Sequence, residues 1–320
     1  MNNLMVDNWF MEEVIADIRD GKIEDSQYYT DLLMAIVLWD EVYYPRNQYN
    51  WWNSVDSQVQ NVLHPIDDSD EYWKKESIEE LCRYKGVKID DWYWLKWKDS
   101  SLVNSDDIMR SGAIRYLALS SKNGLDYLPC IKRQKFLREY LAFNNKHNTL
   151  TRLQFQKNAT EITTKLFLKE YELLNDELNI KIKMPMLAKF VYDNTPHNMT
   201  PIEYALHLKN EGPIIRFRQY LGEIDNAIEN EKKDELRYLL ALSREVIDDV
   251  ILMDRKSILS FDLDIGIVPA IIFKKGNAEA KISPTPSVRI KDINLFDRKY
   301  NLTFFRDVSI HTINDIKKYV

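Results

Sequence analysis

Glycine and cysteine are scarce in this 320-residue chain, which contains 8 glycines and 2 cysteines. So few glycines argue against glycine-rich phosphate loops and favour helices, which tolerate glycine poorly. Neither Cys82 nor Cys130 has a second Cys or a His at zinc-ligand spacing. We therefore expect two inert thiols in a reducing compartment and no metal site.

Long apolar segments are also missing from the sequence. The longest, Leu32–Trp39, is far shorter than the roughly 20 residues that cross a bilayer. Residues 1–10 lack the basic and apolar regions of a secretory signal. These features predict a cytoplasmic protein without a membrane partner, and the abundance of Asn, Lys and Ile favours a bacterial source.

Several catalytic motifs are absent as well. The sequence has no serine nucleophile elbow, no phosphate-loop lysine and no dinucleotide fingerprint, and its five histidines include no His-x3-His pair. We therefore expect no cofactor. The lack of metabolic motifs favours a protein that acts by binding, with a role in host defence or in a mobile element.

Tryptophan is confined to the first 97 residues, where all eight lie. Because indole has a large apolar surface and a polar N–H, the first third is expected to hold an aromatic core or an aromatic recognition surface. Charge is divided as well. Residues 1–110 hold 23 acidic and 11 basic residues, whereas residues 111–320 hold 27 acidic and 33 basic ones. This contrast can attract partners or join the two halves.

Helical periodicity dominates the first 255 residues. It predicts helices over Val6–Ile18, from Asp25 to Tyr43 and over Lys132–Asn144, and it predicts that the apolar run Leu32–Trp39 is buried on most sides. Thr200-Pro201-Ile202-Glu203 is a capping box with proline at the first helical position. After residue 255, alternating segments such as Ser257–Lys275 and Leu302–Ile310 predict strands.

These patterns predict a mainly α protein. We expect a multi-helix, Trp-rich N-terminal domain over residues 1–150, a second helical region over 151–255 and a small β-rich segment over 256–320.

The first candidate site is an aromatic loop with one arginine. Asp40-Glu41 leads into Arg46, and Trp51-Trp52 follows. Exposed indoles beside an arginine can bind a base or a cationic peptide by stacking and cation–π contact. The alternative is a packed loop whose carboxylates pair with Arg46.

The second candidate site is a basic helix that carries Lys132, Arg133, Lys135 and Arg138. Basic residues interleaved with aromatic ones are typical of nucleic-acid binding, because Lys and Arg neutralise phosphates. The alternatives are a solvated helix face or a face that docks on the acidic N-terminal third.

The third candidate pairs Arg306 with His311, five positions further on. This spacing resembles the catalytic signature of HEPN-type ribonucleases, which implies a His general base and an Arg that steadies phosphate charge. In that family the motif lies on a helix of a helical bundle, whereas Leu302–Ile310 predicts a strand.

The fourth candidate is a carboxylate pair, Asp262 and Asp264, which would lie on one face of a strand. With Lys274 or Lys275 on a neighbouring strand, the pair could hold the metal ion of a nuclease. The alternative is an exposed strand face.

Taken together, the sequence favours a non-enzymatic interaction component of a bacterial cytoplasmic assembly. We expect a protein partner, with nucleic acid as the second choice. The alternative is a nuclease that uses either Arg306 and His311 or Asp262 and Asp264.

Overall fold

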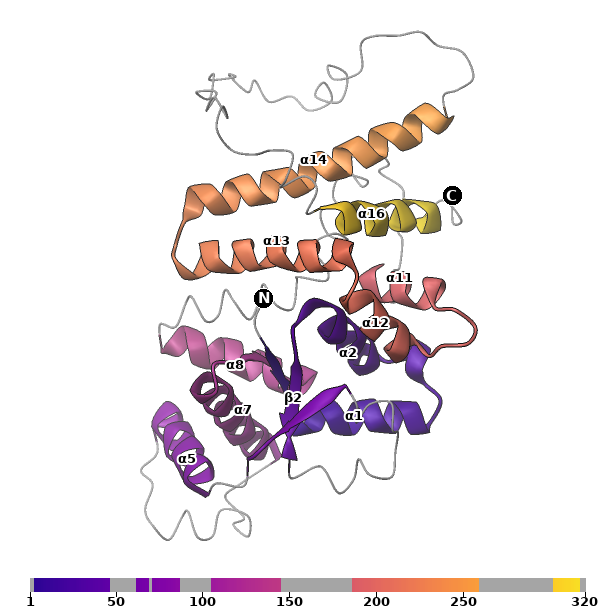
Figure 1. The fold of residues 1–320 in the computed structure, drawn as a ribbon. Helices are drawn as coiled ribbons and strands as arrows, with labels where there is room; N and C mark the ends of the chain where they lie inside the picture. The colour runs from indigo at the N-terminus through magenta and orange to yellow at the C-terminus, as the bar shows by residue number, and fades with distance from the viewer. Residues whose placement is uncertain are drawn as a thin grey trace, which may run out of the picture.

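The computed structural model describes residues 3–46, 62–68, 71–86, 105–144, 186–258 and 302–316. This part of the chain is mostly helical and contains a small parallel sheet (Figure 1). In chain order the elements are β1 (Leu4–Val6), α1 (Asn8–Arg19), the 3-10 turn η1 (Ile23–Asp25), α2 (Gln27–Leu38), β2 (Val42–Pro45), β3 (Leu63–Ile66), α5 (Glu71–Lys85), α7 (Ser105–Lys122), β4 (Asp126–Leu128), α8 (Ile131–Phe143), α11 (Met186–Asn194), α12 (Pro201–Lys209), α13 (Gly212–Glu229), α14 (Lys233–Ile258) and α16 (Thr303–Ile316).

The four strands form one parallel sheet in the order β3-β2-β1-β4. Leu4 of β1 is in register with Val42 of β2 on one side and with Asp126 of β4 on the other. The chain therefore proceeds outward from β1 through β2 to β3, and then returns to place β4 on the opposite side of β1. This reversal makes the position between β1 and β4 a topological switch point.

Helices cover both faces of the sheet, as Figure 1 shows. Leu4 and Val6 pack into a hydrophobic cluster with α1 and α2, whereas Met5 packs into a second cluster with α5, α7 and α8. Successive side chains of a strand point to opposite faces, so three consecutive apolar residues serve both clusters.

Helix α2 lies between the sheet and the C-terminal helices. Every residue from Leu32 to Trp39 is at most 4% exposed, which confirms the prediction that this run is buried on most sides. The reason is that α2 contacts α1 on one side and α11, α12 and α13 on another.

Helix caps agree with the sequence patterns. Asp7 caps α1 by accepting the Phe10 N–H at 2.9 Å, and Ser26 caps α2 by accepting the Tyr29 N–H at 2.9 Å. The predicted capping box of α12 is confirmed, because Thr200 and Glu203 each accept the other's backbone N–H.

The mainly α prediction holds for the helix content but missed the sheet in the first third. The helix expected to run to Tyr43 ends at Leu38, and Val42–Pro45 forms β2; Asp126–Leu128, for which no strand was predicted, forms β4. Both strands are only three or four residues long and carry apolar side chains on both faces. Such strands lack the polar–apolar alternation that marks a half-exposed strand.

The strand predicted over Leu302–Ile310 is wrong, because residues 303–316 form α16. Leu302, Phe304 and Val308 are buried, but Arg306 and Ile310 at the other even positions are exposed, and Ser309 at an odd position is buried. The apolar residues therefore follow a helical period that a short segment does not distinguish from alternation. The rest of the predicted β-rich segment, residues 259–301, lies outside the described residues.

The C-terminal helices α13, α14 and α16 stack beyond α2 (Figure 1). One hydrophobic cluster extends from Leu4 in β1 through α2 to Val308 in α16. The first helices and the last thus share a core, and the division of the chain at residues 150 and 255 stays a prediction. Within the described ranges, no helix is long and apolar enough to cross a membrane.

Candidate functional site

The carboxyl ends of the four parallel strands meet at one edge of the sheet. Asp7 follows β1, Arg46 follows β2, Asp68 lies beyond β3 and Cys130 lies beyond β4. In open α/β sheets, ligands bind outside this edge, at the switch point in strand order. Here that point lies between β1 and β4, so it is bounded by Asp7 and by the first turn of α8.

Asp7 is completely buried and joins three elements at this edge. Its Oδ1 accepts the N–H of Phe10, while its Oδ2 accepts the hydroxyl of Tyr127 at 2.9 Å and the N–H of Cys130 at 3.0 Å. Arg133 Nη1 also lies 3.0 Å from Oδ2. The carboxylate is thus held by β4, α8 and its own helix.

Arg133 is 3% exposed, so it does not belong to an exposed basic helix face as the sequence had indicated. Besides Asp7, its Nη1 donates to Asn8 Oδ1 at 2.9 Å, and its guanidinium lies 5.2 Å from the Tyr116 ring centroid. Burial lowers the pKa of Arg133, but the Asp7 carboxylate together with Tyr127, Cys130 and Tyr116 outweighs it, and the pKa is raised. A Cβ atom at Gly112 would lie 2.5 Å from Arg133 Nη2, so α7 needs glycine there.

A second, partly buried ion pair lies beyond β3. Arg115 Nη2 donates to Asp68 Oδ2 at 3.1 Å and also to the Asp68 carbonyl, and the Tyr116 hydroxyl donates to the same Oδ2 at 3.3 Å. The Arg115 guanidinium lies 5.4 Å from the Tyr116 ring centroid. Tyr116 therefore contacts both guanidinium groups and links the two pairs.

The two cysteines are free and buried. Burial, reinforced by the Asp7 carboxylate, raises the pKa of Cys130 to about 12. Burial also raises the pKa of Cys82. Because the thiolate is the nucleophilic form, Cys130 is not a nucleophile near neutral pH despite its place at the edge.

The outer layer of the edge is basic and aromatic. Lys132, Lys135 and Arg138 are exposed on α8. Half-buried Trp9 of α1 has the Lys132 Nζ 4.7 Å from its ring centroid, and Glu13 Oε1 lies 4.0 Å from the same Nζ.

Arg46 is exposed at the end of β2, at the same edge of the sheet. Since β2, β1 and β4 are adjacent and parallel, Arg46, Trp9 and Lys132 follow three neighbouring strand ends. The structure thus brings together two sets of residues that the sequence analysis had treated as separate sites. We call the exposed or half-buried residues of this outer layer the edge surface: Trp9, Arg46, Lys132, Lys135 and Arg138. Trp51 and Trp52 lie outside the described residues.

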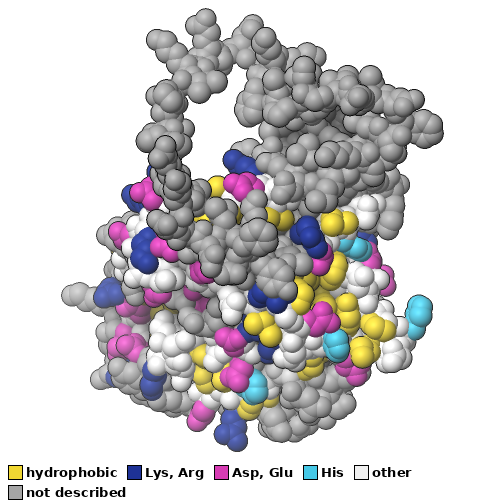
Figure 2. Space-filling view, turned by 45° about the horizontal axis from the view of Figure 1, so that its top comes forward, with side chains coloured by type: hydrophobic (Ala, Val, Ile, Leu, Met, Phe, Trp, Pro, Cys, Tyr) yellow, Lys and Arg dark blue, Asp and Glu magenta, His cyan; other side chains and the backbone are white. Residues whose placement is uncertain are grey.

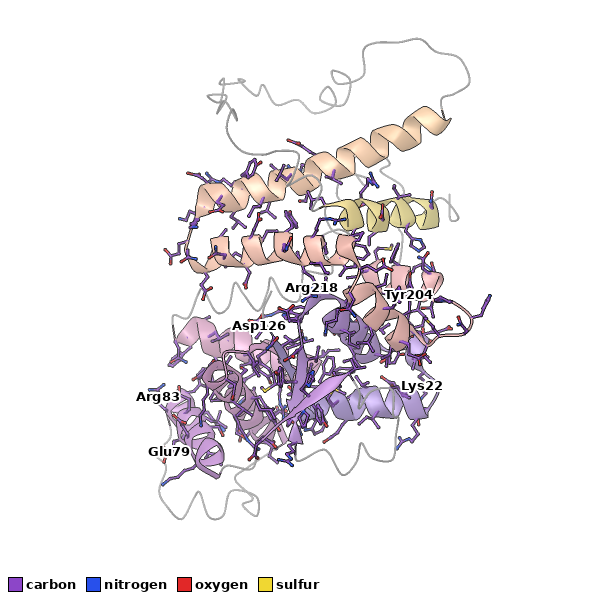
Figure 3. All side chains as sticks on the ribbon, viewed as in Figure 1. Lys22, Glu79, Arg83, Asp126, Tyr204 and Arg218 are labelled. Atoms are coloured by element: carbon purple, nitrogen blue, oxygen red, sulfur yellow. The ribbon has the colours of Figure 1, made fainter. Side chains whose placement is uncertain are left out.

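The carboxylates before β2 do not join Arg46. Asp40 pairs with Arg218 of α13, and Glu41 accepts the Tyr43 hydroxyl at 2.5 Å. Both carboxylates lie at the amino edge of the sheet, where Trp39 Nε1 donates to Asp126 Oδ2 at 3.1 Å. Figure 3 shows Arg218 and Asp126 in the zone between α13 and the sheet. The α13 helix therefore closes this opposite edge.

Arg306 and His311 both lie on α16. His311 Nε2 is 2.9 Å from Asp193 Oδ2 of α11, and Lys189 Nζ is 3.0 Å from the same oxygen. Burial tends to raise the pKa of Asp193, but its bonds to Lys189 and His311 outweigh it and lower the pKa. Arg306 is exposed and lies 3.4 Å from Asp307.

The other candidate residues are placed as follows. Asp262 and Asp264 lie outside the described residues. Among the residues that the structure describes, no three His, Cys, Asp or Glu side chains gather as a metal ion would require. On the face that Figure 2 presents, acidic and basic side chains of the described residues are interspersed.

Sequence reasoning missed Asp7 and Trp9 as site residues. The signal was present in Leu4-Met5-Val6-Asp7-Asn8, an apolar triplet followed directly by polar residues and a helix. That pattern is typical of a buried parallel strand that ends at a ligand-binding edge.

No family model matches this chain, and neither a curated protein nor a solved structure matches it.

Proposed function

We propose that the protein is a binding component that holds nucleic acid on the edge surface. The observation that carries the proposal is that Arg46, Trp9 and Lys132 follow three neighbouring strand ends at the carboxyl edge of the sheet, with the exposed Lys135 and Arg138 further along α8. This is the edge at which open α/β sheets bind ligands, and lysine and arginine neutralise phosphates there.

The buried charges behind the edge surface support a binding role over a catalytic one. Asp7 is paired with Arg133, and Asp68 with Arg115. These charges are paired within the fold, so the exposed cations of the edge surface are the ones that would contact a ligand.

Carboxylates close to the edge surface limit its affinity. Glu13 lies 4.0 Å from Lys132, and Glu139 is exposed on α8 among the basic residues. We therefore expect binding in the range of non-specific complexes, with a dissociation constant of about 10⁻⁶ to 10⁻⁴ M at physiological salt. Four phosphate contacts would give a salt slope of about 3 for a single strand.

The test is a titration of a short fluorescent oligonucleotide at about 50 and about 200 mM salt. A variant with Lys132→Gln, Lys135→Gln and Arg138→Gln should lose affinity at least about tenfold and reduce the salt slope by about 2. A control with Lys22→Gln, Lys232→Gln and Lys233→Gln removes the same charge away from the edge and should bind like the wild type.

Two outcomes would overturn the proposal: a wild-type protein that binds no oligonucleotide at the lower salt, or two triple variants that lose affinity equally. A third outcome would assign the edge surface to a protein partner. In that case the wild type binds no nucleic acid but captures a protein from native cells, and only the Lys132, Lys135 and Arg138 triple variant loses that protein.

A second candidate function, ribonuclease activity at α16, is favoured by one specific observation. The pair Arg306 and His311 lies on a helix packed against α11, α13 and α14, as the resemblance to HEPN-type ribonucleases requires, and His311 is 2.9 Å from Asp193. His311 would act as general base, Asp193 would orient its ring, and Arg306 would steady the phosphate charge.

Cleavage of labelled RNA, with chelator and with Mg²⁺, tests this candidate. His311→Ala and Arg306→Ala should abolish cleavage, whereas Ile310→Ala, at an exposed position of the same helix, should leave it unchanged. Wild-type protein that cleaves no RNA contradicts the candidate. Cleavage that needs Mg²⁺ and persists in His311→Ala would point instead to Asp262 and Asp264.

A further inference from the structure

We infer that the edge surface selects single-stranded nucleic acid, and that one base stacks on Trp9 after the Lys132 ammonium leaves the ring. The inference rests on the proposed binding function and names the form of nucleic acid that the same surface takes. It depends on how Trp9 is covered in the free protein.

Trp9 lies in the first turn of α1, directly beyond the carboxyl end of β1. Its ring is half-buried and packs against the hydrophobic cluster that contains α1 and α2. This packing fixes the ring in place, so a ligand does not have to order it. A fixed, partly accessible aromatic ring is the usual platform for an unpaired base.

In the free protein the Lys132 ammonium lies over the Trp9 ring and covers it. Its Nζ lies 4.7 Å from the centroid of the Trp9 ring, while its side chain is 57% exposed. Its partner Glu13 is 4.0 Å away, at the long limit of an ion pair. Exposed ion pairs and exposed cation–π contacts are both weak, so this cover is easily displaced.

A phosphate is a stronger partner for the Lys132 ammonium than its contacts with the Trp9 ring and Glu13. The Lys132 side chain is long and flexible, and the exposed Lys135 and Arg138 lie further along the same helix. When the sugar–phosphate backbone of a nucleic acid lies along these cations, Lys132 can pair with a phosphate and uncover the Trp9 ring. The same event that neutralises charge therefore opens the stacking surface.

A second half-buried ring lies beside the first turn of α8. Tyr28 lies beside the backbone of Ile131, a residue that is 46% exposed. Burial, with the nearby Cys130, raises the pKa of Tyr28 to about 12, so its hydroxyl stays neutral and does not repel a phosphate. Trp9 and Tyr28 thus flank the turn that carries Lys132.

Single strands fit this arrangement better than duplexes do. In a duplex each base is already stacked between its neighbours, and only the phosphates are free to bind the cations. In a single strand an unpaired base can leave its neighbours and stack on an aromatic ring, which every base does because every base has a π face. The selectivity for single strands then resides in Trp9, and the salt dependence resides in the cations.

The experiment measures the affinity of the full chain for one oligonucleotide and for the duplex of the same sequence. Trp9→Leu should weaken single-strand binding by about 5-fold to 100-fold, the range for loss of one base–aromatic stack, and leave duplex binding unchanged. Trp9→Phe keeps a ring and should recover most of the loss. Phe143→Leu removes a 63% exposed ring at the far end of α8 and serves as the matched control.

Lys132→Met tests the cover separately, because methionine keeps an apolar stem without the charge. It should reduce the salt slope for single strands by about 0.7, the value of one phosphate contact, while the loss caused by Trp9→Leu persists in the double variant. Thermal unfolding of each variant shows that a loss of binding is not a loss of folding.

The outcomes separate this inference from the proposed function. A wild-type protein that binds neither oligonucleotide nor duplex overturns both. A wild-type protein that binds the two forms equally, with Trp9→Leu neutral in a folded protein, overturns the stacking inference and leaves the edge surface as a phosphate-binding surface.

Discussion

The carboxylate of Asp7 lies 3.0 Å from Nη1 of Arg133, and both side chains are at most 3% exposed. The pair joins the end of β1 to the first turn of α8 across the switch point of the sheet. The buried Asp7–Arg133 pair therefore fixes the first turn of α8, and with it the exposed cations of that helix.

We expect Arg133→Ala to destabilise the protein by about 3 to 5 kcal/mol, because it leaves the Asp7 carboxylate buried without its cation. The free energy of unfolding from urea titrations measures the effect. Lys135→Ala, half a turn away and exposed, should change it by less than about 0.5 kcal/mol. Equal effects of the two substitutions would show that Asp7 does not depend on Arg133.

Gly112→Ala is expected to destabilise the protein, although alanine normally favours a helix by about 1 kcal/mol over glycine. The new Cβ would lie 2.5 Å from Arg133 Nη2, and displacing this fixed side chain costs about 1 to 3 kcal/mol. Ser121→Ala, at an exposed position of the same helix, is the control. In the double variant with Arg133→Ala, the two losses should be less than additive, since the clash is then gone. Strict additivity would contradict the contact.

Alkaline pH should weaken the fold through Cys130. Its pKa is raised to about 12 from 9.0 by burial and by Asp7, so the folded state favours the protonated thiol. Its contribution to stability is complete below pH 9.0 and is lost as the pH rises from 9.0 towards about 12. One such group gives a slope of at most about 1.4 kcal/mol per pH unit. Cys130→Ala should flatten the dependence of unfolding free energy on pH just above 9.0, and an unchanged slope would show that the thiol ionises freely.

Local patterns identified the helices well. Ser26 before α2 and the Thr200–Glu203 box before α12 are signals that act over a few residues. Apart from the apolar triplet of β1, the strands had no such signal, because their pairing is non-local: β4 pairs with β1 across the intervening α1, α2, β2, β3, α5 and α7. A three-residue strand is stabilised by its neighbours in the sheet and not by its own sequence.

The candidate site was also predicted only in part, because charge can be read from the sequence whereas burial depends on non-local packing. Arg46, Lys132, Lys135 and Arg138 were recognised from charge, and the ends of β2 and β4 bring Arg46 and the first turn of α8 to the same edge of the sheet. Arg133 looked identical to its neighbours in the sequence, and only the burial of Asp7 distinguishes it. The strand predicted over Leu302–Ile310 failed because two turns of a helix can mimic alternation.

The most direct measurement is a photo-cross-link between the full chain and a single-stranded oligonucleotide that carries 5-iodouracil, followed by mass spectrometry of the adducts. If the edge surface binds nucleic acid, the adducts will fall on Trp9 or Tyr28, and the Lys132, Lys135 and Arg138 triple variant will lose them. Adducts that fall only on other parts of the chain, and that persist in this variant, would contradict binding at the carboxyl edge of the sheet.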